Sequence, residues 1–215
     1  MGWRDIADGE VDSLSPVTVS LMTALRDNPK AIAQRDLGAP RVKPPSIELI
    51  DTVGSSTWTV PDGVTRLRYT LVGGGGGGGD ADNTLGGVGS DGGDSTLNDG
   101  TNTYTAGGGA GGTATVNLTI GGAGGTASGG ILNLDGTFGF GNGLVGVTPL
   151  VGTSYGAGGR GGQAAGGAGG GSAAVVQGSI EVIPGNSLAY TIADGGAGGG
   201  QAGFDGVKGA LILEY

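Results

Sequence analysis

Short runs in which apolar and polar residues alternate recur along the chain from Ile47 to the C-terminus. Alternation with a period of two, in runs rich in β-branched residues, is typical of half-buried β-strands. The pattern predicts strands at residues 47–53, 113–120, 174–183, 188–193 and 209–215, and two more within residues 56–72. We therefore expect a mainly β fold, built around a β-sandwich-like domain.

Two turn sequences separate pairs of these strands. Pro61-Asp62-Gly63 divides residues 56–72, and Pro184-Gly185-Asn186 follows the strand predicted at residues 174–183. Proline presets φ for a turn, and glycine or asparagine tolerates the left-handed conformation that often follows. The strands around the first turn each have one apolar side, which we expect in the core: Trp58, Val60, Leu67, Tyr69 and Leu71.

The N-terminal part shows a helical period instead. Ser15 and Pro16 resemble a helix start, with serine as N-cap and proline in the first turn. Apolar residues then recur at i, i+4, i+7 and i+8, which predicts a helix at residues 16–26 that Asn28-Pro29 ends. The apolar face of this helix consists of Val17, Leu21, Ala24 and Leu25.

Such a helix has only about three turns and is marginal in water by itself, so it needs a surface to dock on. The proline-rich residues 38–45 favour an extended connection, which separates an arm, residues 1–45, from a domain, residues 46–215. Two interpretations remain. The helix packs on its own domain, or it anchors the chain to a larger assembly through Val17, Leu21, Leu25 and Arg26.

Glycine interrupts the strand pattern with a period of three. Of the 55 glycines, 50 follow Val72, and Gly-Gly-X repeats run through residues 123–126, 157–163, 165–171 and 195–200. A polyproline II-type helix has three residues per turn and no internal hydrogen bonds, so these repeats leave bare backbone edges that can bond to neighbouring helices. We predict packed polyglycine II helices with glycine-rich loops. The alternative is a flexible linker, which the interleaved strands disfavour.

Composition narrows the function. The chain has no cysteine and no histidine, the side chain most used for proton transfer and zinc binding. The net charge is −9, and residues 73–215 carry two basic residues against ten acidic ones, so a phosphate backbone would be repelled. No apolar run reaches the length of about 18 residues that indicates a membrane span. We expect neither nucleic-acid binding nor membrane insertion.

Two motifs resemble functional sequences but lack essential parts. Gly73–Gly79 follows a strand as a phosphate-binding loop does, yet no Gly-Lys-Ser/Thr follows it. Residues 86–94 partly match a calcium-binding β-roll repeat, without tandem copies. No spacing pairs two carboxylates for glycoside hydrolysis. We predict no catalytic, cofactor or metal site, and we expect five aspartates in solvated loops rather than around a hard cation: Asp80, Asp82, Asp91, Asp94 and Asp99.

Two stretches, residues 97–105 and 131–155, break the glycine pattern and gather aromatic and amide side chains. One interpretation is that Phe138 and Phe140, two residues apart, form the inward face of another strand. The other is that both stretches are loops on a rigid glycine scaffold, the usual setting of binding residues. The candidate receptor contacts are then Asn102, Tyr104, Phe138, Phe140, Asn142 and Tyr155.

The run Trp58-Thr-Val-Pro-Asp-Gly-Val-Thr-Arg-Leu-Arg-Tyr-Thr-Leu-Val72 leads into polyglycine, and the chain closes with Gly209-Ala-Leu-Ile-Leu-Glu-Tyr215. Together they resemble the β-hairpin and final strand of glycine-rich domains in tailed-bacteriophage fibre and virion proteins. Residues 21–34 and 38–41 look like the N-terminal segment by which phage structural proteins attach to the particle. The Gly-Gly-X tracts are distantly similar to those of the adhesin at the tip of T-even-type long tail fibres, although they are fewer and shorter.

This resemblance implies a non-enzymatic structural protein on the virion surface, a fibre or spike. Residues 1–45 would attach to other virion proteins, and the domain would contact a host-surface glycan or protein. By family analogy the assembly would be a homo-oligomer, a trimer. The alternative is an architectural head or tail decoration protein that binds no receptor.

Overall fold

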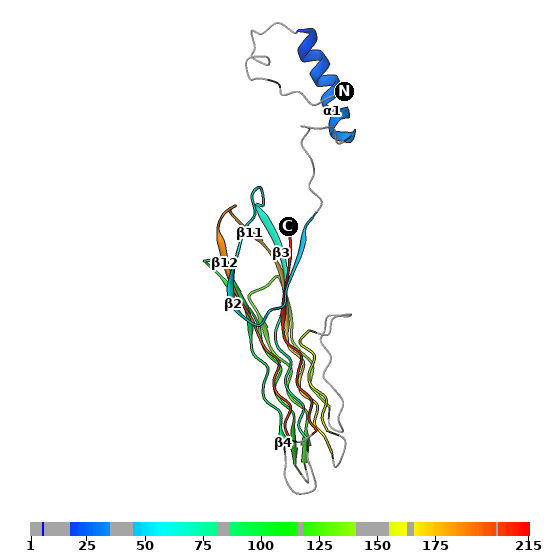
Figure 1. Ribbon diagram of the computed structural model, residues 1–215, viewed down its shortest axis with the longest axis vertical. Coiled ribbons are helices and arrows are strands. Elements are labelled where there is room, and N and C mark those ends of the chain that lie inside the picture. The colour runs from blue at the N-terminus through cyan, green and yellow to red at the C-terminus, as the bar shows by residue number, and fades with distance from the viewer. Residues whose placement is uncertain are drawn as a thin grey trace. The chain divides into compact units, whose positions relative to one another are not determined.

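The computed structural model describes residues 6, 18–34, 45–80, 87–115, 118–140, 155–162, 166–200 and 202–215. The chain divides into two compact units, Met1–Pro45 and Ser46–Tyr215, at the position where the composition changes. The described residues form 13 strands in three antiparallel sheets and one helix (Figure 1). The expected mainly β fold with a short helical N-terminal segment is therefore confirmed.

In the N-terminal unit, the helix α1 spans Val19–Gln34. The hydroxyl oxygen of Thr18 accepts a hydrogen bond from the amide of Leu21 at 3.1 Å and so caps the first turn. The predicted end at Asn28-Pro29 is wrong, because Pro29 lies inside the helix. Proline removes one helical hydrogen bond, but the residues after it include lysine, two alanines and glutamine, which are strong helix formers and continue the helix.

The second unit contains a β-sandwich, in which every strand pairing is antiparallel. One sheet consists, in spatial order, of β1 (Ile47–Ile50), β13 (Ala210–Glu214), β3 (Arg66–Val72), β11 (Val175–Glu181) and β10 (Leu132–Leu134). The other consists of β2 (Gly54–Thr59), β12 (Ser187–Ile192), β5 (Ser95–Asn98), β6 (Thr103–Ala106) and β9 (Ala127–Ser128). Apart from residues 113–120, each stretch predicted as a strand is found near its expected position.

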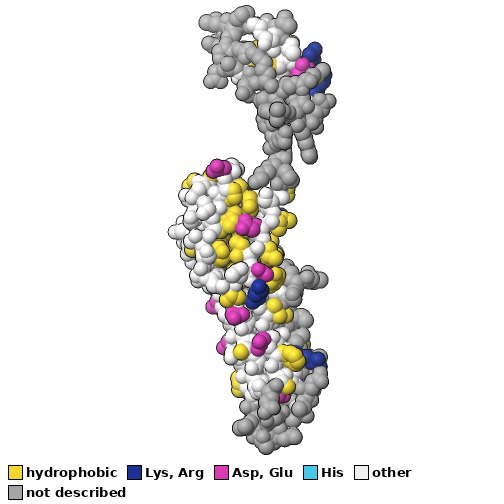
Figure 2. Space-filling view, viewed as in Figure 1, with side chains coloured by type: hydrophobic (Ala, Val, Ile, Leu, Met, Phe, Trp, Pro, Cys, Tyr) yellow, Lys and Arg dark blue, Asp and Glu magenta, His cyan; other side chains and the backbone are white. Residues whose placement is uncertain are grey.

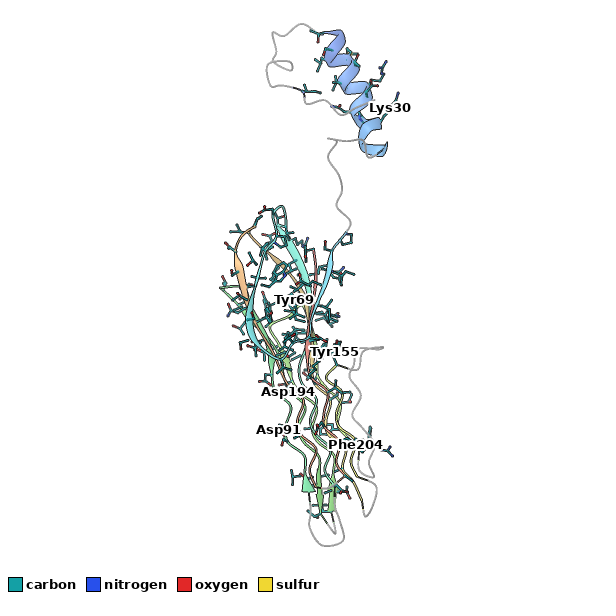
Figure 3. The ribbon with its side chains drawn as sticks, viewed as in Figure 1. Lys30, Tyr69, Asp91, Tyr155, Asp194 and Phe204 are labelled. Atoms are coloured by element: carbon teal, nitrogen blue, oxygen red, sulfur yellow. The ribbon has the colours of Figure 1, made fainter. Side chains whose placement is uncertain are left out.

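The two sheets enclose one apolar core. Its centre includes Leu67 and Leu71 of β3, which are fully buried, and Tyr69 (Figure 3). The ring centroids of Tyr69 and Tyr104 are 4.9 Å apart. Trp58 is also buried, and its indole Nε1 donates to Glu48 of β1 at 2.8 Å. The apolar side predicted for each of the two strands is therefore the core side.

The strands on either side of Pro61-Asp62-Gly63 do not pair with each other. β2 pairs with β12, whereas β3 lies between β11 and β13 in the opposite sheet. The predicted hairpin is therefore wrong, and this turn crosses between the sheets. The turn at Pro184-Gly185-Asn186 also crosses, and the two turns bond to each other through Val60: its amide donates to Asn186 at 2.8 Å, and its carbonyl accepts from Gly185 at 2.9 Å.

All sandwich strands except β1 and β2 continue directly into glycine-rich segments, which run side by side away from the sandwich (Figure 1). A further segment, residues 156–162, begins beside the sandwich and forms hydrogen bonds with these segments. We call these segments the glycine bundle: residues 73–79, 87–93, 107–112, 121–125, 136–140, 156–162, 167–174, 194–199 and 203–209. Strand pairing in the sandwich thus sets which glycine segments become neighbours.

Residues 73–79 lie at the centre of the bundle. Gly73, Gly76 and Gly79 donate to residues 174, 171 and 168 of one neighbour at 3.2, 2.9 and 2.7 Å. The amides of the residues between them donate to two other segments. Every third amide therefore bonds to the same neighbouring segment. The carbonyl oxygens of this central segment accept hydrogen bonds from three further segments, again with every third residue bonded to the same segment. Six neighbours and a period of three define a polyglycine II bundle, which confirms that prediction.

Close approach of the backbones is what requires glycine in this bundle. None of the residues 73–79 has a positive φ. A Cβ on Gly73 would lie 2.6 Å from the carbonyl oxygens of Ala106 and Gly107, and a Cβ on Gly76 would overlap the carbonyl of Ala110. Because Cβ atoms do not approach within 3.0 Å of other heavy atoms, any side chain here would force the segments apart. The glycine-rich stretches are therefore a packed element and not a linker.

The stretch 113–120, predicted as one strand, contains two strands that pair with each other. β7 (Thr113–Thr115) pairs with β8 (Leu118–Ile120), and β4 (Gly87–Val88) completes the third sheet on the other side of β7. The hydroxyl oxygen of Thr115 accepts the amide of Leu118 at 3.1 Å. No glycine or proline marks this reversal in the sequence, so the alternating pattern did not reveal it.

Candidate functional site

Two predicted contact residues, Asn102 and Tyr104, belong to the hairpin between β5 and β6, which turns at the end of the sandwich away from the glycine bundle. Tyr104 is buried, and its hydroxyl donates to Asp99 at 2.7 Å. The amides of Thr101 and Asn102 donate to the other carboxylate oxygen of Asp99 at 2.8 and 2.6 Å. Asp99 therefore organises this loop, and the Tyr104 hydroxyl is used inside the fold.

Opposing effects act on the pKa of Asp99. Burial would raise it, but the hydrogen bonds from Asn102, Tyr104 and Thr101 together hold the pKa below its usual value. Burial, followed by the hydrogen bond to Asp99, raises the pKa of Tyr104 to about 12. A carboxylate with a lowered folded pKa stabilises the fold above its unfolded pKa, and this stabilisation is lost as pH falls through the folded pKa.

Replacing Tyr104 with phenylalanine is expected to lower the unfolding free energy by about 1 to 2 kcal/mol at pH 7, because the ring stays and only the hydrogen bond to a carboxylate is lost. The loss should shrink in acid, once Asp99 is protonated in both states. Urea unfolding at pH 7 and at low pH measures the loss of unfolding free energy under the two conditions. Tyr190→Phe is the control, since no described carboxylate accepts from the Tyr190 hydroxyl. An equal loss at both pH values would show that Asp99 is not the partner that matters.

Tyr155 lies beside the sandwich, where the segment of residues 156–162 begins (Figure 3). Its hydroxyl donates to Asp51 at 2.8 Å, and Lys208 Nζ lies 3.2 Å from the same carboxylate oxygen. The hydrogen bond from Tyr155, followed by that from Lys208, holds the pKa of Asp51 below its usual range. These contacts connect the chain after β1 to the bundle, so the Tyr155 hydroxyl also has an internal partner.

Phe138 and Phe140 are exposed, with 67% and 57% of their surfaces accessible. The interpretation that they form the inward face of a strand is wrong. Their segment follows the period of three: Gly136 and Gly139 donate to residues 125 and 122 at 2.8 Å, and the two phenylalanines flank Gly139. Asn142, the remaining predicted contact, lies outside the described residues.

Exposed apolar side chains also lie on the adjoining third sheet. Val88 of β4 and Ile120 of β8 are both opposite Thr113 of β7, and Leu118 lies on β8. β8 continues into residues 121–125, which bond to the segment of Phe138 and Phe140. Figure 2 shows apolar side chains at the surface of the second unit. We call five residues, each more than half exposed, the apolar strip: Val88, Leu118, Ile120, Phe138 and Phe140.

The sequence indicated only part of this strip. Leu118 and Ile120 were expected in a half-buried strand, and nothing in the pattern showed that the third sheet has an open face. Tyr104, by contrast, was a candidate contact that the structure places in the core. The predicted contact residues that the structure describes therefore do not converge on one site, and of these only the two phenylalanines join a larger exposed surface.

Asp91 and Asp94 lie on the outside of the bundle (Figure 3 labels Asp91). Asp91 accepts the amide of Gly111 at 2.8 Å, and Asp94 accepts the amide of Gly108 at 2.9 Å. The two aspartates are three residues apart, and so are the two glycines. The carboxylates therefore accept hydrogen bonds from amides on the outside of the bundle, where no further segment is present to accept them. Both carboxylates are exposed, as expected for solvated aspartates, and each also accepts an amide of the bundle. Among the described residues no group of three or more His, Cys, Asp or Glu side chains is placed to hold a metal ion.

A shallow cavity of about 270 Å³ opens on the outer face of the first sheet. Its polar side chains are already paired across strands: Arg68 lies 3.6 Å from Glu214, and Gln177 donates to Thr70 at 3.2 Å. Ile131 adds an apolar wall. The arrangement offers hydrogen bonds to a small polar group, but no nucleophile stands beside a general base in it.

The predicted anchoring residues differ in exposure. Leu21 is buried, whereas Leu25, one turn further along the same side of the helix, is 54% exposed, so this side is only partly covered. Arg26 is paired with Asp27, with 2.8 Å between guanidinium and carboxylate. Val17, like the predicted helix start before it, lies outside the described residues. Met22 is exposed beside Leu25 and was not among the predicted residues.

Comparisons of the chain with protein-family models, with curated proteins and with solved structures each return no match. No helix in the described ranges is long and apolar enough to cross a membrane. Function is therefore inferred from the geometry of the chain and from its sequence resemblance.

Proposed function

We propose that this chain is a structural protein of a phage particle, a fibre or spike exposed on the virion surface. The observation that carries the proposal is the glycine bundle, in which the backbones of the glycine segments bond sideways to one another in three dimensions. A bundle of this kind is stiff without an apolar core, which suits an element that projects from a particle. The resemblance of residues 58–79 and 209–215 to phage fibre and virion proteins supports the same class.

The place where the arm enters the domain supports attachment through residues 1–45. Ser46 and Tyr215 exchange backbone hydrogen bonds of 2.6 and 3.0 Å. In the same sheet Ile50 lies opposite Leu211, closer to the point where β13 meets the bundle. The chain thus enters at the end of the sandwich away from the bundle. An anchor in the arm would hold this end and leave the bundle free to project.

We assign host contact to the apolar strip. It lies on the bundle and the third sheet, away from Ser46, and combines two aromatic with three aliphatic side chains on a rigid frame. Exposed aromatic rings contribute much contact area to binding, and rigid scaffolds commonly carry binding residues. A host-surface glycan or protein is the proposed partner. The described acidic residues of the distal chain and the absence of histidine support neither a nucleic-acid partner nor acid–base catalysis.

A purely architectural decoration protein is the second candidate. The internal use of the Tyr104 and Tyr155 hydroxyls favours it, because two of the predicted contact groups already have partners within the fold. In either case we propose a homo-oligomer, with three copies by analogy to phage fibres. The two candidates differ in whether the isolated domain binds host cells.

Deleting residues 1–45 is expected to leave a folded domain that binds host cells but no longer joins particles. The domain has its own core and forms a separate compact unit, so it should fold without the arm. Immunoblots of purified particles measure incorporation, and labelled protein measures cell binding. Incorporation of the shortened chain at normal levels would overturn the anchoring role. Folded domain without cell binding would leave the architectural candidate.

The contact surface is tested by the double variant Phe138→Ser and Phe140→Ser, which should weaken cell binding by about tenfold or more if these rings are binding hot spots. Incorporation into particles should be unchanged. Phe204→Ser is the matched control, because Phe204 is 59% exposed on a different bundle segment (Figure 3). Equal binding by both variants would remove the strip from the proposal.

A further inference from the structure

Asp80 directly follows the central segment of the glycine bundle and is only 2% exposed. One oxygen of its carboxylate, Oδ2, accepts the amide of Ala202 at 3.1 Å. The other, Oδ1, is buried and has no hydrogen-bond partner. No ion pair of the described residues includes Asp80. This is not the solvated acidic loop that the sequence led us to expect.

A buried carboxylate with a free oxygen is unfavourable. Removing a charged group from water costs several kcal/mol unless a hydrogen bond or an opposite charge compensates it. Such a group in a native fold calls for an explanation, and a bound ion is one of the standard ones. The rest of the bundle shows how unusual this is, since Asp91 and Asp94 each accept an amide at the surface.

Among the described residues, two glycines pack against the carboxylate of Asp80. A Cβ on Gly162 would overlap Oδ1, so this glycine lies directly against it. Gly200 lies on another side, where a Cβ would be 3.0 Å from the main-chain oxygen of Asp80 and 3.5 Å from Oδ2. Among the described residues, neither the carbonyl of Asp80 nor that of Gly162 accepts a hydrogen bond. Two carbonyl oxygens next to the carboxylate in the chain or in the packing thus lack a described donor, as Oδ1 does.

We propose that Asp80 Oδ1 binds a calcium ion at this end of the central segment, together with main-chain carbonyl oxygens of Asp80 and Gly162. Carboxylate and backbone carbonyl oxygens are the usual protein ligands of Ca²⁺, whose coordination tolerates irregular geometry and water. A site with a single carboxylate is weak, and dissociation constants of about 10⁻⁴ to 10⁻³ M are typical of weak sites in extracellular modules. The ion would join the segments that end at residues 80 and 162 and compensate the buried charge.

Calcium titration of the full chain, first treated with a chelator, tests the site. Calorimetry should show one ion per chain, and the unfolding midpoint should rise by about 3 to 5 °C for each tenfold increase in Ca²⁺ above the dissociation constant. The amide NMR signals of Gly162 and Ala202 should shift during the titration. These measurements need no variant, so they decide the matter even if substitutions at Asp80 prevent folding. No heat, no stabilisation and unmoved signals would overturn the proposal.

Asp80→Asn keeps the shape of the side chain and removes its charge. The variant should bind no Ca²⁺, and in chelator it should be more stable than the unmodified chain, because it buries no uncompensated charge. Asp91→Asn is the matched control: it removes a carboxylate from the same bundle and should leave calcium binding unchanged. Undiminished binding by Asp80→Asn, or binding of Mg²⁺ in place of Ca²⁺, would contradict the site as proposed.

Discussion

Replacing Gly76 with alanine is expected to lower the unfolding free energy of the domain by at least about 3 kcal/mol, as severe overpacking does. The amide of Gly76 donates to Gly171 at 2.9 Å, and its carbonyl accepts from Gly159 at 2.7 Å. The new Cβ would overlap the carbonyl of Ala110. This obstacle is backbone, so no rotamer change relieves it, and the bundle must widen. Urea unfolding followed by circular dichroism measures the loss.

Gly93→Ala is the matched control for this variant. The closest atom to a Cβ on Gly93 would be the Cβ of Ala193, at 3.2 Å, and the next two would be at 3.8 Å, an ordinary contact. Alanine also lowers the conformational entropy of the unfolded chain, which stabilises the fold by about 0.4 to 1 kcal/mol. We expect its stability to stay within about 1 kcal/mol of the unmodified chain. Failure of Gly76→Ala to fold, with a folded Gly93→Ala, would agree with the prediction. Equal tolerance of both alanines would mean that the segments are not packed at backbone distance.

The amides of Gly75, Gly76 and Gly78 are expected to exchange with solvent about 10⁴-fold or more slowly than in a free peptide. Each is buried and bonded to a neighbouring segment at 2.9 Å, Gly75 and Gly78 to residues 203–209 and Gly76 to residues 167–174. Opening one of them requires separation of segments that are bonded on every side, so exchange should approach the limit set by global unfolding of a stable domain. Hydrogen exchange followed by NMR measures these rates.

Gly195 provides the comparison within the same molecule. Its amide donates to the carboxylate of the preceding Asp194 at 2.9 Å, an exposed local contact (Figure 3 labels Asp194). It should exchange far faster than the central glycines. Fast exchange throughout residues 73–79 would show that the bundle is not rigid, and the proposed fibre role would then lose its structural support.

Local patterns predicted the elements of the sandwich well. Leu67, Tyr69 and Leu71 alternate with polar residues, so they share one side of a strand whatever that strand pairs with. The pairing itself was not predictable in this way. Pro61-Asp62-Gly63 specifies a reversal of the chain, but whether the reversal makes a hairpin or crosses to the opposite sheet depends on β12, β11 and β13, which lie more than 100 residues further along the chain.

Exposure was harder to predict than conformation. Tyr104 and Phe138 look alike in the sequence, as aromatic residues in stretches that break the glycine pattern. Tyr104 packs against Tyr69 and bonds to Asp99, whereas Phe138 lies on a bundle segment with open edges. The difference is set by the neighbours that each segment acquires in the fold. The burial of Asp80 has the same origin, because Gly162 and Gly200 meet it only when the distant segments pack together.

The amino-acid sequence by itself determined the local backbone: a period of two for the strands, a period of three for the glycine segments, and the change of composition that separates arm from domain. These properties depend on steric preferences within a few residues. The tertiary structure alone decided which strands pair, which segment has six neighbours, and which aspartates and aromatic rings reach solvent. Glycine has no side chain to specify a partner, so the order of the bundle is imposed by the strands that lead into it and by the hydrogen bonds that their register brings into line.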